Sequence, residues 1–305
     1  MQIVRFLLID LIPAAALVLL LCNRRRIFCA DADVLDRRES TKIRGLLAVL
    51  ILLHHISITT ATGVLMKTFA VVGIFCVAVF FFYSGYGLMT GYMQKENYLK
   101  GFFKKRIAKI LIPYLISGAV TFLAHLLMRY KFTPSEIFNS LFTGDPIVKY
   151  SWYVLVILLL YLIFYIAARF LKKPILILPA VLAGTVGYAV IVETQFSWGN
   201  WTINSCLAFS FGILFAMYRD KYRPLLRGGK KITLLMLVSA LLAAVAVALR
   251  FLNAEIPPAV LLSFPECADF LMRSPSVFIA MNWIALVGIL LFFQVCRKIR
   301  LNDRV

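Results

Sequence analysis

Apolar runs of about twenty residues recur along the whole sequence, and they constrain the fold more than any other feature. An α-helix of roughly twenty residues is about 30 Å long, which matches the hydrocarbon core of a bilayer. With 62% hydrophobic residues and a mean hydropathy of +0.89, the chain carries more apolar surface than one soluble core could bury. We therefore predict an all-α fold, a polytopic membrane helix bundle of about nine transmembrane helices. The predicted spans are 3–22, 44–65, 69–92, 109–128, 151–171, 174–192, 200–218, 232–252 and 277–296.

The basic residues indicate the orientation of these helices. A formal net charge of +19 raises nucleic acid as a partner, unless the charges mark one side of a bilayer. Alternate loops between the predicted spans hold 26 of the 33 lysines and arginines, and the opposite loops hold 7. Cytoplasmic loops are enriched in basic residues. We therefore expect a multi-pass protein of a bacterial-type inner membrane, with the N-terminus outside and the C-terminus in the cytoplasm, whose partner is the lipid bilayer and not nucleic acid.

The loop after the fourth predicted span carries local helix signals. Thr133, Pro134 and Glu136 form a helix start, and Gly144 with Asp145 forms a turn. We expect a short interfacial helix over the outer mouth of the bundle. The six cysteines form no CxxC pair, so neither a zinc site nor a disulfide framework is indicated, and we expect no metal.

Ionisable residues inside predicted spans are few, and such residues are costly and often functional. Arg44 begins one span at its cytoplasmic end, and His54 and His55 lie near its middle. The eleven residues from Arg44 to His55 make three helical turns plus about 20°, which places both on one face about 16 Å apart. Arginine binds phosphate, and histidine exchanges a proton near neutral pH or attacks a thioester. The pair therefore suggests a channel for an acyl-CoA.

Three alternatives remain open from these residues alone. The histidines could be hydrogen-bonded between helices and Arg44 a membrane anchor. The protein could be a transporter or flippase for a lipid-linked or small solute, with Asp10 and the histidines in a proton relay. It could also be a membrane sensor whose basic loop at 219–231 binds anionic lipid. No corresponding repeat links 1–150 with 151–305, as transporter halves would often show.

Three ordered sequence blocks carry a resemblance to a known family. The first runs from Arg44 to His55 as RGLLAVLILLHH, an arginine and a histidine separated by ten residues. The second is the aromatic run FFFYSGY at 80–86, and the third is FKKRIAKILIPY at 103–114, a basic segment that leads into Pro-Tyr. Together they resemble the integral-membrane acyltransferase family 3, whose members O-acylate glycans and other cell-surface acceptors.

The resemblance implies roles for particular residues. It makes His55 the catalytic residue, and Arg44 and Arg106 the residues that engage acyl-CoA. Lys109 stands where the family more often has arginine, which keeps the charge but loses bidentate phosphate recognition. His54 has no counterpart in the motif and is treated as a neighbour that tunes His55 or pairs with another helix. Ser84 is another neighbour, read with Gly85 as a place where helices approach closely.

The resemblance also implies an activity and an organisation. We expect an acyltransferase that moves an acyl group, most simply acetyl, from acyl-CoA to a hydroxyl of an extracytoplasmic glycan, with acyl-CoA as donor substrate and no bound cofactor. Residues 1–38 are expected to add an N-terminal transmembrane helix and a basic cytoplasmic loop. Residues 39–305 form the expected acyltransferase-like membrane domain, and we expect it to be truncated at its C-terminus, because relatives commonly continue into one more helix.

Overall fold

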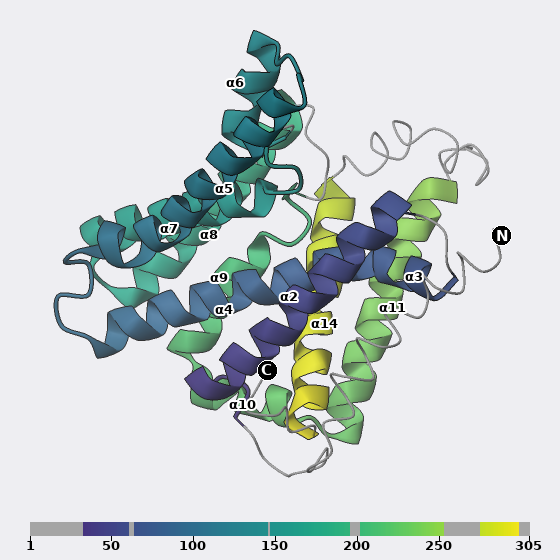
Figure 1. The fold of residues 1–305 in the computed structure, drawn as a ribbon. Coiled ribbons are helices and arrows are strands. Elements are labelled where there is room, and N and C mark those ends of the chain that lie inside the picture. The colour runs from purple at the N-terminus through teal and green to yellow at the C-terminus, as the bar shows by residue number, and fades with distance from the viewer. Residues whose placement is uncertain (1–32, 61–63, 146, 196–201, 253–274, 299–305) are drawn as a thin grey trace. The chain divides into compact units, whose positions relative to one another are not determined.

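The computed structural model describes residues 33–60, 64–145, 147–195, 202–252 and 275–298. Every regular element within these ranges is a helix (Figure 1). The long helices are α2 (Arg37–Thr60), α4 (Val72–Gln94), α5 (Ala108–Leu127), α7 (Trp152–Leu171), α8 (Pro174–Gln195), α11 (Lys230–Leu252) and α14 (Pro275–Lys298). The shorter elements are α3 (Val64–Thr68), the 3-10 helix η1 (Phe69–Val71), the π-helix η2 (Phe103–Ile107), α6 (Pro134–Thr143), α9 (Leu207–Met217) and α10 (Arg219–Arg227).

Several of these helices are long and apolar enough to cross a membrane, which confirms the predicted polytopic helix bundle. In the described part of the chain there are seven: Arg37–Thr59, Val72–Gln94, Phe103–Leu127, Trp152–Leu171, Pro174–Gln195, Lys230–Ala248 and Pro275–Arg297. Two of the nine predicted spans have no counterpart among them. The span at 3–22 lies outside the described residues. The span at 200–218 corresponds to α9, whose 11 residues are too short to cross the hydrocarbon core alone.

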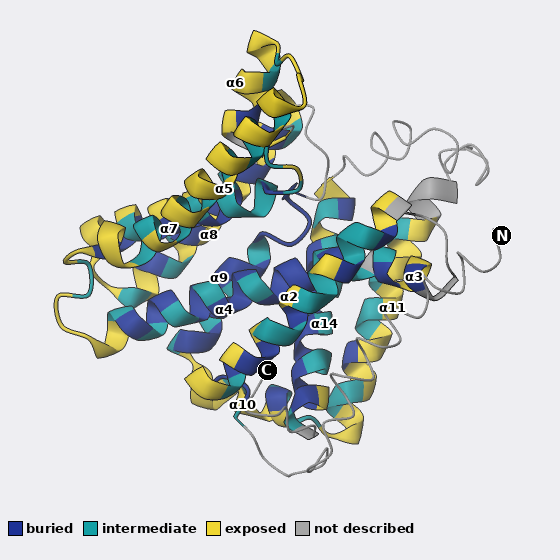
Figure 2. Cartoon of the chain, in the orientation of Figure 1, coloured by how far each residue is buried: buried dark blue, intermediate teal, exposed yellow. Residues whose placement is uncertain are grey.

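The outward surface of the helices matches a lipid environment. Figure 2 shows α4 mostly buried, whereas α5 and α11 are largely exposed. In the most apolar part of each span, 67% of the residues are buried in Val72–Gln94 but none in Phe103–Leu127. The exposed side chains of α5 include Leu115, Ile116 and Leu123. A continuous apolar surface of this kind is unfavourable in water and suits contact with lipid tails.

The contacts divide the chain into two compact units. One unit comprises residues 1–84 and 218–305, and the other comprises residues 85–217. The division falls inside α4, between Ser84 and Gly85. The two units are described separately.

In the first unit, the N-terminal part of α4 packs on α14 through aromatic rings. The Phe75 ring meets the Phe292 ring edge-on at 5.4 Å, and the rings of Phe82 and Tyr83 each lie 5.3 Å from that of Phe293. Both α11 and α10 also pack against α14. These contacts make α14 the helix on which the described C-terminal segment of this unit is assembled.

A glutamine links three helices of the first unit. The Gln294 amide donates to the Leu225 carbonyl at 2.8 Å and accepts from the Thr233 hydroxyl at 2.9 Å. Gly228, at the end of α10, has a φ of +71, and a Cβ there would lie 2.8 Å from the Gln294 amide. A buried amide is stable only when its donors and acceptors are satisfied, so Gln294 fixes how α10, α11 and α14 meet.

The second unit is organised around α7, which packs against α5, α6 and α8, and α8 in turn packs against α9. Phe102, only 1% exposed, lies against the rings of Phe164 and Tyr165 of α7. At Gly85, α4 approaches the backbone of α9 so closely that a Cβ would lie 2.0 Å from the Phe209 carbonyl oxygen. Only glycine allows this approach.

The short helix predicted after the fourth span is present as α6. Thr133 is its N-cap and Glu136 completes a capping box, because each side chain binds the backbone N–H of the other residue. Gly144 ends the helix in the left-handed conformation, with a φ of 80. Both predicted boundaries are confirmed.

Candidate active site

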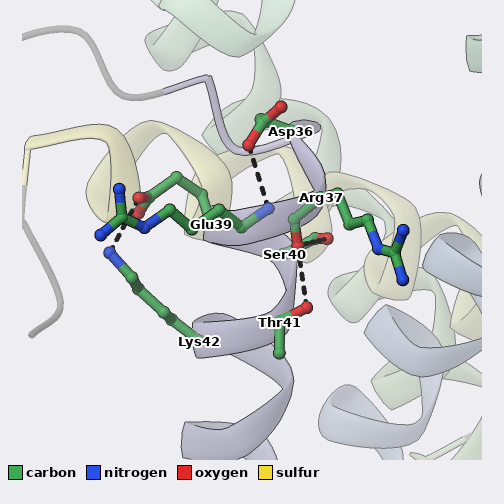
Figure 3. Close-up of polar contacts among 7 residues, drawn as sticks. Asp36, Arg37, Glu39, Ser40, Thr41 and Lys42 are labelled. Atoms are coloured by element: carbon green, nitrogen blue, oxygen red, sulfur yellow. Dashed lines mark hydrogen bonds and ion pairs between the residues drawn. The ribbon is translucent and has the colours of Figure 1, made fainter. Parts of the chain in front are cut away.

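The helix that carries the histidines begins earlier than predicted. Asp36 accepts a hydrogen bond from the Arg38 backbone N–H at 3.0 Å, and Ser40 N donates to the Asp36 carbonyl at 2.9 Å. Figure 3 shows the polar first turns, where Glu39 pairs with Lys42 at 3.0 Å. The predicted span 44–65 was therefore displaced, since α2 runs from Arg37 to Thr60. Apolar content marks the membrane part of a helix, whereas its cap and polar first turns decide where the helix starts.

The segment before α2 is also anchored in the first unit. The Tyr83 hydroxyl donates to the Val34 carbonyl at 2.9 Å in a buried position. Asp33 forms an ion pair with Arg219 at the start of α10. The N-terminal end of α2 is therefore held to both α4 and α10.

Arg44 is exposed and its side chain bends back along α2. Its Nε donates to the Ser40 carbonyl at 3.1 Å, and its Nη2 donates to the Thr41 hydroxyl at 3.2 Å. These bonds hold the guanidinium beside the polar turns at the N-terminal end of the helix. A guanidinium has five N–H donors in a planar fork, so this placement suits binding of a phosphate group.

His54 is locked into the packing of the first unit. Its Nδ1 lies 3.1 Å from the Phe69 carbonyl oxygen of η1. Because a carbonyl can only accept, the hydrogen is on Nδ1. The imidazole also lies against Gly73 of α4, where a Cβ would be 2.4 Å from Cδ2 and from Nε2. His54 therefore joins α2 to the segment that leads into α4.

His55 follows directly and is half-buried. Its ring centroid lies 5.1 Å from that of His54, with the two rings tilted by 57°. Since α2 is one continuous α-helix through Arg44 and His55, these residues keep the separation expected from their spacing, about 16 Å along one face. The structure thus supplies a cation about two turns from the start of the helix and an imidazole three turns farther along.

Arg106 and Lys109 belong to the second unit. Arg106 lies in the π-helix η2 and is half-buried, with its guanidinium carbon 5.6 Å from the centroid of the Tyr98 ring. This is a cation–π contact. Burial raises the pKa of the Tyr98 hydroxyl, and the nearby Arg106 charge acts in the opposite direction. Lys109 is exposed in the first turn of α5.

A comparison with known families identifies the chain. The sequence profile of the family described as "Acyltransferase domain" matches residues 42–301. The chain belongs to this acyltransferase family. The resemblance to integral-membrane acyltransferase family 3 is thereby confirmed, and the protein is a membrane acyltransferase in the broad sense. No curated protein and no solved structure gave a significant match.

In this acyltransferase the predicted site residues fall into two sets. The first unit holds Arg44, His54 and His55 on α2 and Ser84 on α4, and the second holds Arg106 and Lys109. Ser84 is half-buried and adjoins Gly85, which lies close to the backbone of α9. Across the described ranges, no three or more His, Cys, Asp or Glu side chains gather as a metal site would need.

The second unit of the acyltransferase contains a cavity that is not predicted from the sequence. It has a volume of about 530 Å³, and its lining includes three cations and three tyrosines. The lining residues are Tyr92, Lys95, Asn97, Tyr98, Leu99, Lys100, Tyr165 and Arg169. From the sequence, the basic residues at 95–100 indicate the cytoplasmic side first and a phosphate site second. The one sequence signal for this cavity is the alternation of lysines with Tyr92 and Tyr98. The sequence does not indicate that residues of α7 complete its lining.

Proposed function

We propose that the protein transfers an acyl group, most simply acetyl, from cytoplasmic acyl-CoA to a hydroxyl of an extracytoplasmic glycan. The observation that supports this best is the placement of Arg44 and His55 on one face of the continuous helix α2. A phosphate-binding cation would hold the donor near the N-terminal turns of the helix, and a proton-exchanging group would lie about 16 Å farther along it. Family membership supplies the reaction class.

In this proposal His55 acts as the catalytic base. Its imidazole takes the proton of the acceptor hydroxyl while the hydroxyl oxygen attacks the thioester carbonyl. The tetrahedral intermediate collapses, the carbon–sulfur bond breaks, and the CoA thiolate receives the proton from the imidazolium. Alternatively the imidazole attacks the thioester and an acyl-histidine passes the group to the hydroxyl. Both routes give one ester and one thiol for each thioester consumed.

Each of the two units contributes cations that we propose engage the donor. Arg44 and Arg106 present guanidinium groups, which match the geometry of phosphate oxygens, and Lys109 adds an exposed ammonium group. The basic loops favour a protein with its N-terminus outside and its C-terminus in the cytoplasm, which would place this end of α2 on the side where acyl-CoA is found.

The experiment compares matched variants of the two histidines in full-length protein in nanodiscs. Asparagine can reproduce the Nδ1–H donor of histidine but cannot act as a base, so His54→Asn and His55→Asn are suitable partners. We expect His55→Asn to reduce release of free thiol from acetyl-CoA by at least about 100-fold, as for loss of a general base. His54→Asn should retain most activity, and Arg44→Gln should raise KM.

Two outcomes would count against the proposed function. Thiol release that is unaffected by His55→Asn would remove the catalytic role of this residue. Wild-type protein that is folded but neither releases thiol nor binds CoA would contradict the assignment of acyl-CoA as donor.

A further inference from the structure

The cavity in the second unit is built from two segments that are distant in the sequence. One is the loop between α4 and η2, which contributes Lys95 and Lys100, and the other is the end of α7, which contributes Arg169. All three side chains are exposed. Between residues 92 and 109 the chain has six lysines and arginines but only one acidic residue, Glu96. The cavity therefore favours an anion.

The loop that carries the two lysines is held in a defined conformation. Asn97 and Gly101 have φ values of 51 and 72, and Lys100 N donates to the Asn97 carbonyl at 2.8 Å. Phe102 follows and is almost fully buried against α7. A loop fixed in this way loses little conformational entropy when a ligand binds.

The tyrosines that line the cavity are also positioned by contacts. The Tyr92 hydroxyl donates to the Lys172 carbonyl at 2.7 Å, at the end of α7. The Tyr98 ring lies against Gly91, where a Cβ would be 2.5 Å from Cε2. The Tyr165 ring packs against those of Phe102 and Phe103, at centroid distances of 5.3 and 4.8 Å. The result is an aromatic lining beside three cations.

Cations beside fixed aromatic rings suit one class of ligand. Phosphates bind lysine and arginine, and a planar base stacks on aromatic side chains. A volume of about 530 Å³ lies within the range of small-molecule sites, about 300–1,000 Å³. In addition, Tyr98 lines the cavity and also lies under the guanidinium of Arg106, the residue expected to engage acyl-CoA.

We propose that this cavity binds the nucleotide part of the acyl donor. Lys95, Lys100 and Arg169 bind the phosphate groups that flank the ribose, and the base packs on the tyrosine rings. None of these residues belongs to the three blocks that carry the family resemblance. Because this inference rests on the proposed function, the experiment measures binding and catalysis separately.

The binding experiment uses full-length protein in nanodiscs of zwitterionic lipid, with adenosine 3′,5′-bisphosphate as the probe in equilibrium dialysis. We expect Lys100→Gln to weaken binding about tenfold, because a charge-assisted hydrogen bond is lost. Tyr165→Leu should weaken it about fivefold through lost stacking. Arg169 also stabilises the last turn of α7, so Lys100 is the cleaner test of the cavity.

The matched control is Lys173→Gln, which removes an exposed cation just after α7 that does not line the cavity. Its affinity should stay within about twofold of wild type. An equal loss in Lys100→Gln and Lys173→Gln would overturn the proposal in favour of diffuse surface charge. Pyrophosphate should compete with the bisphosphate, but its binding should be insensitive to Tyr165→Leu.

A lipid headgroup could also supply a phosphate, and a second arm separates the two sources. The wild type and Lys100→Gln are compared in nanodiscs with and without phosphatidylglycerol. Failure to bind the bisphosphate in zwitterionic lipid, together with Lys100-dependent enrichment of phosphatidylglycerol, would assign the cavity to lipid and overturn the proposal.

The two proposals can fail independently. If the bisphosphate binds in a Lys100-dependent way but no thiol is released, the binding role of the cavity is supported and the proposed function is rejected. If thiol is released but Lys100→Gln leaves the KM for acetyl-CoA unchanged, the proposed function is supported and the cavity is rejected as the donor site.

Discussion

The Nδ1 atom of His54 lies 3.1 Å from the carbonyl oxygen of Phe69 and thereby joins α2 to the segment that enters α4. This hydrogen bond distinguishes the roles of the two adjacent histidines. His54 holds two elements of the first unit together, whereas the motif position belongs to His55. From the sequence, His54 is expected either to tune His55 or to pair with another helix, and in the structure its imidazole contacts Phe69 of η1.

Removing the His54 imidazole should therefore reduce stability more than replacing it with asparagine. His54→Ala leaves the Phe69 carbonyl without its donor, and the loss of such a bond costs about 1–2 kcal/mol. His54→Asn keeps a donor near the Nδ1 position and should recover most of that loss. Thermal unfolding in detergent measures both variants. Equal unfolding temperatures for the two would show that the hydrogen bond contributes little.

Gly73→Ala should disturb the same contact from the opposite side. The added Cβ would lie 2.4 Å from two atoms of the His54 ring, so the ring or the helix must move. Overpacking of this kind costs about 1–3 kcal/mol, and the helix propensity of alanine offsets about 1 kcal/mol of it. Gly87→Ala on the same helix is the control, because nothing lies within 4 Å of its added Cβ.

A double variant identifies the cause of the Gly73→Ala effect. In His54→Ala/Gly73→Ala the colliding ring is absent, so the second substitution should cost little beyond the first. We expect an unfolding temperature close to that of His54→Ala alone, which is strong coupling in a double-mutant cycle. Additive losses would mean that Gly73 is required by a neighbour other than His54.

Local signals in the sequence predicted α6 well. Thr133, Glu136 and Gly144 act within one or two turns of each other, so their pattern is readable without the rest of the fold. The start of α2 was missed for a related reason. Its cap, Asp36, and its polar first turns lie outside the apolar run on which the prediction depended.

Contacts between distant segments could not be predicted. Nothing in the sequence near His54 indicates that Phe69 and Gly73 contact its side chain, although Phe69 follows it by only 15 residues. The cavity depends on Arg169 and Tyr165 of α7 meeting a loop about seventy residues earlier in the chain. The π-helix η2, which carries Arg106, also has no sequence signal.

The cap of α6 makes this helix sensitive to acid. The carboxylate of Glu136 accepts from Thr133 N at 2.8 Å and from the Tyr130 hydroxyl at 2.7 Å. These bonds, chiefly that from the Thr133 backbone, hold the pKa of Glu136 below its ordinary value of 4.5. A group with a depressed pKa in the folded state contributes stability that is present above its ordinary pKa and is lost as the pH falls through the folded value.

Protection of the α6 amides from hydrogen exchange should therefore decrease below about pH 4.5, after correction for the intrinsic exchange rate. Glu136→Gln keeps an oxygen acceptor for the Thr133 N–H but cannot titrate, so its α6 should show no such decrease. Asp145, the ionisable residue just after the helix, is present in both proteins and serves as the internal control. If Glu136→Gln shows the same acid-dependent loss of amide protection, the capping box is not its cause, and Asp145 is the next residue to test.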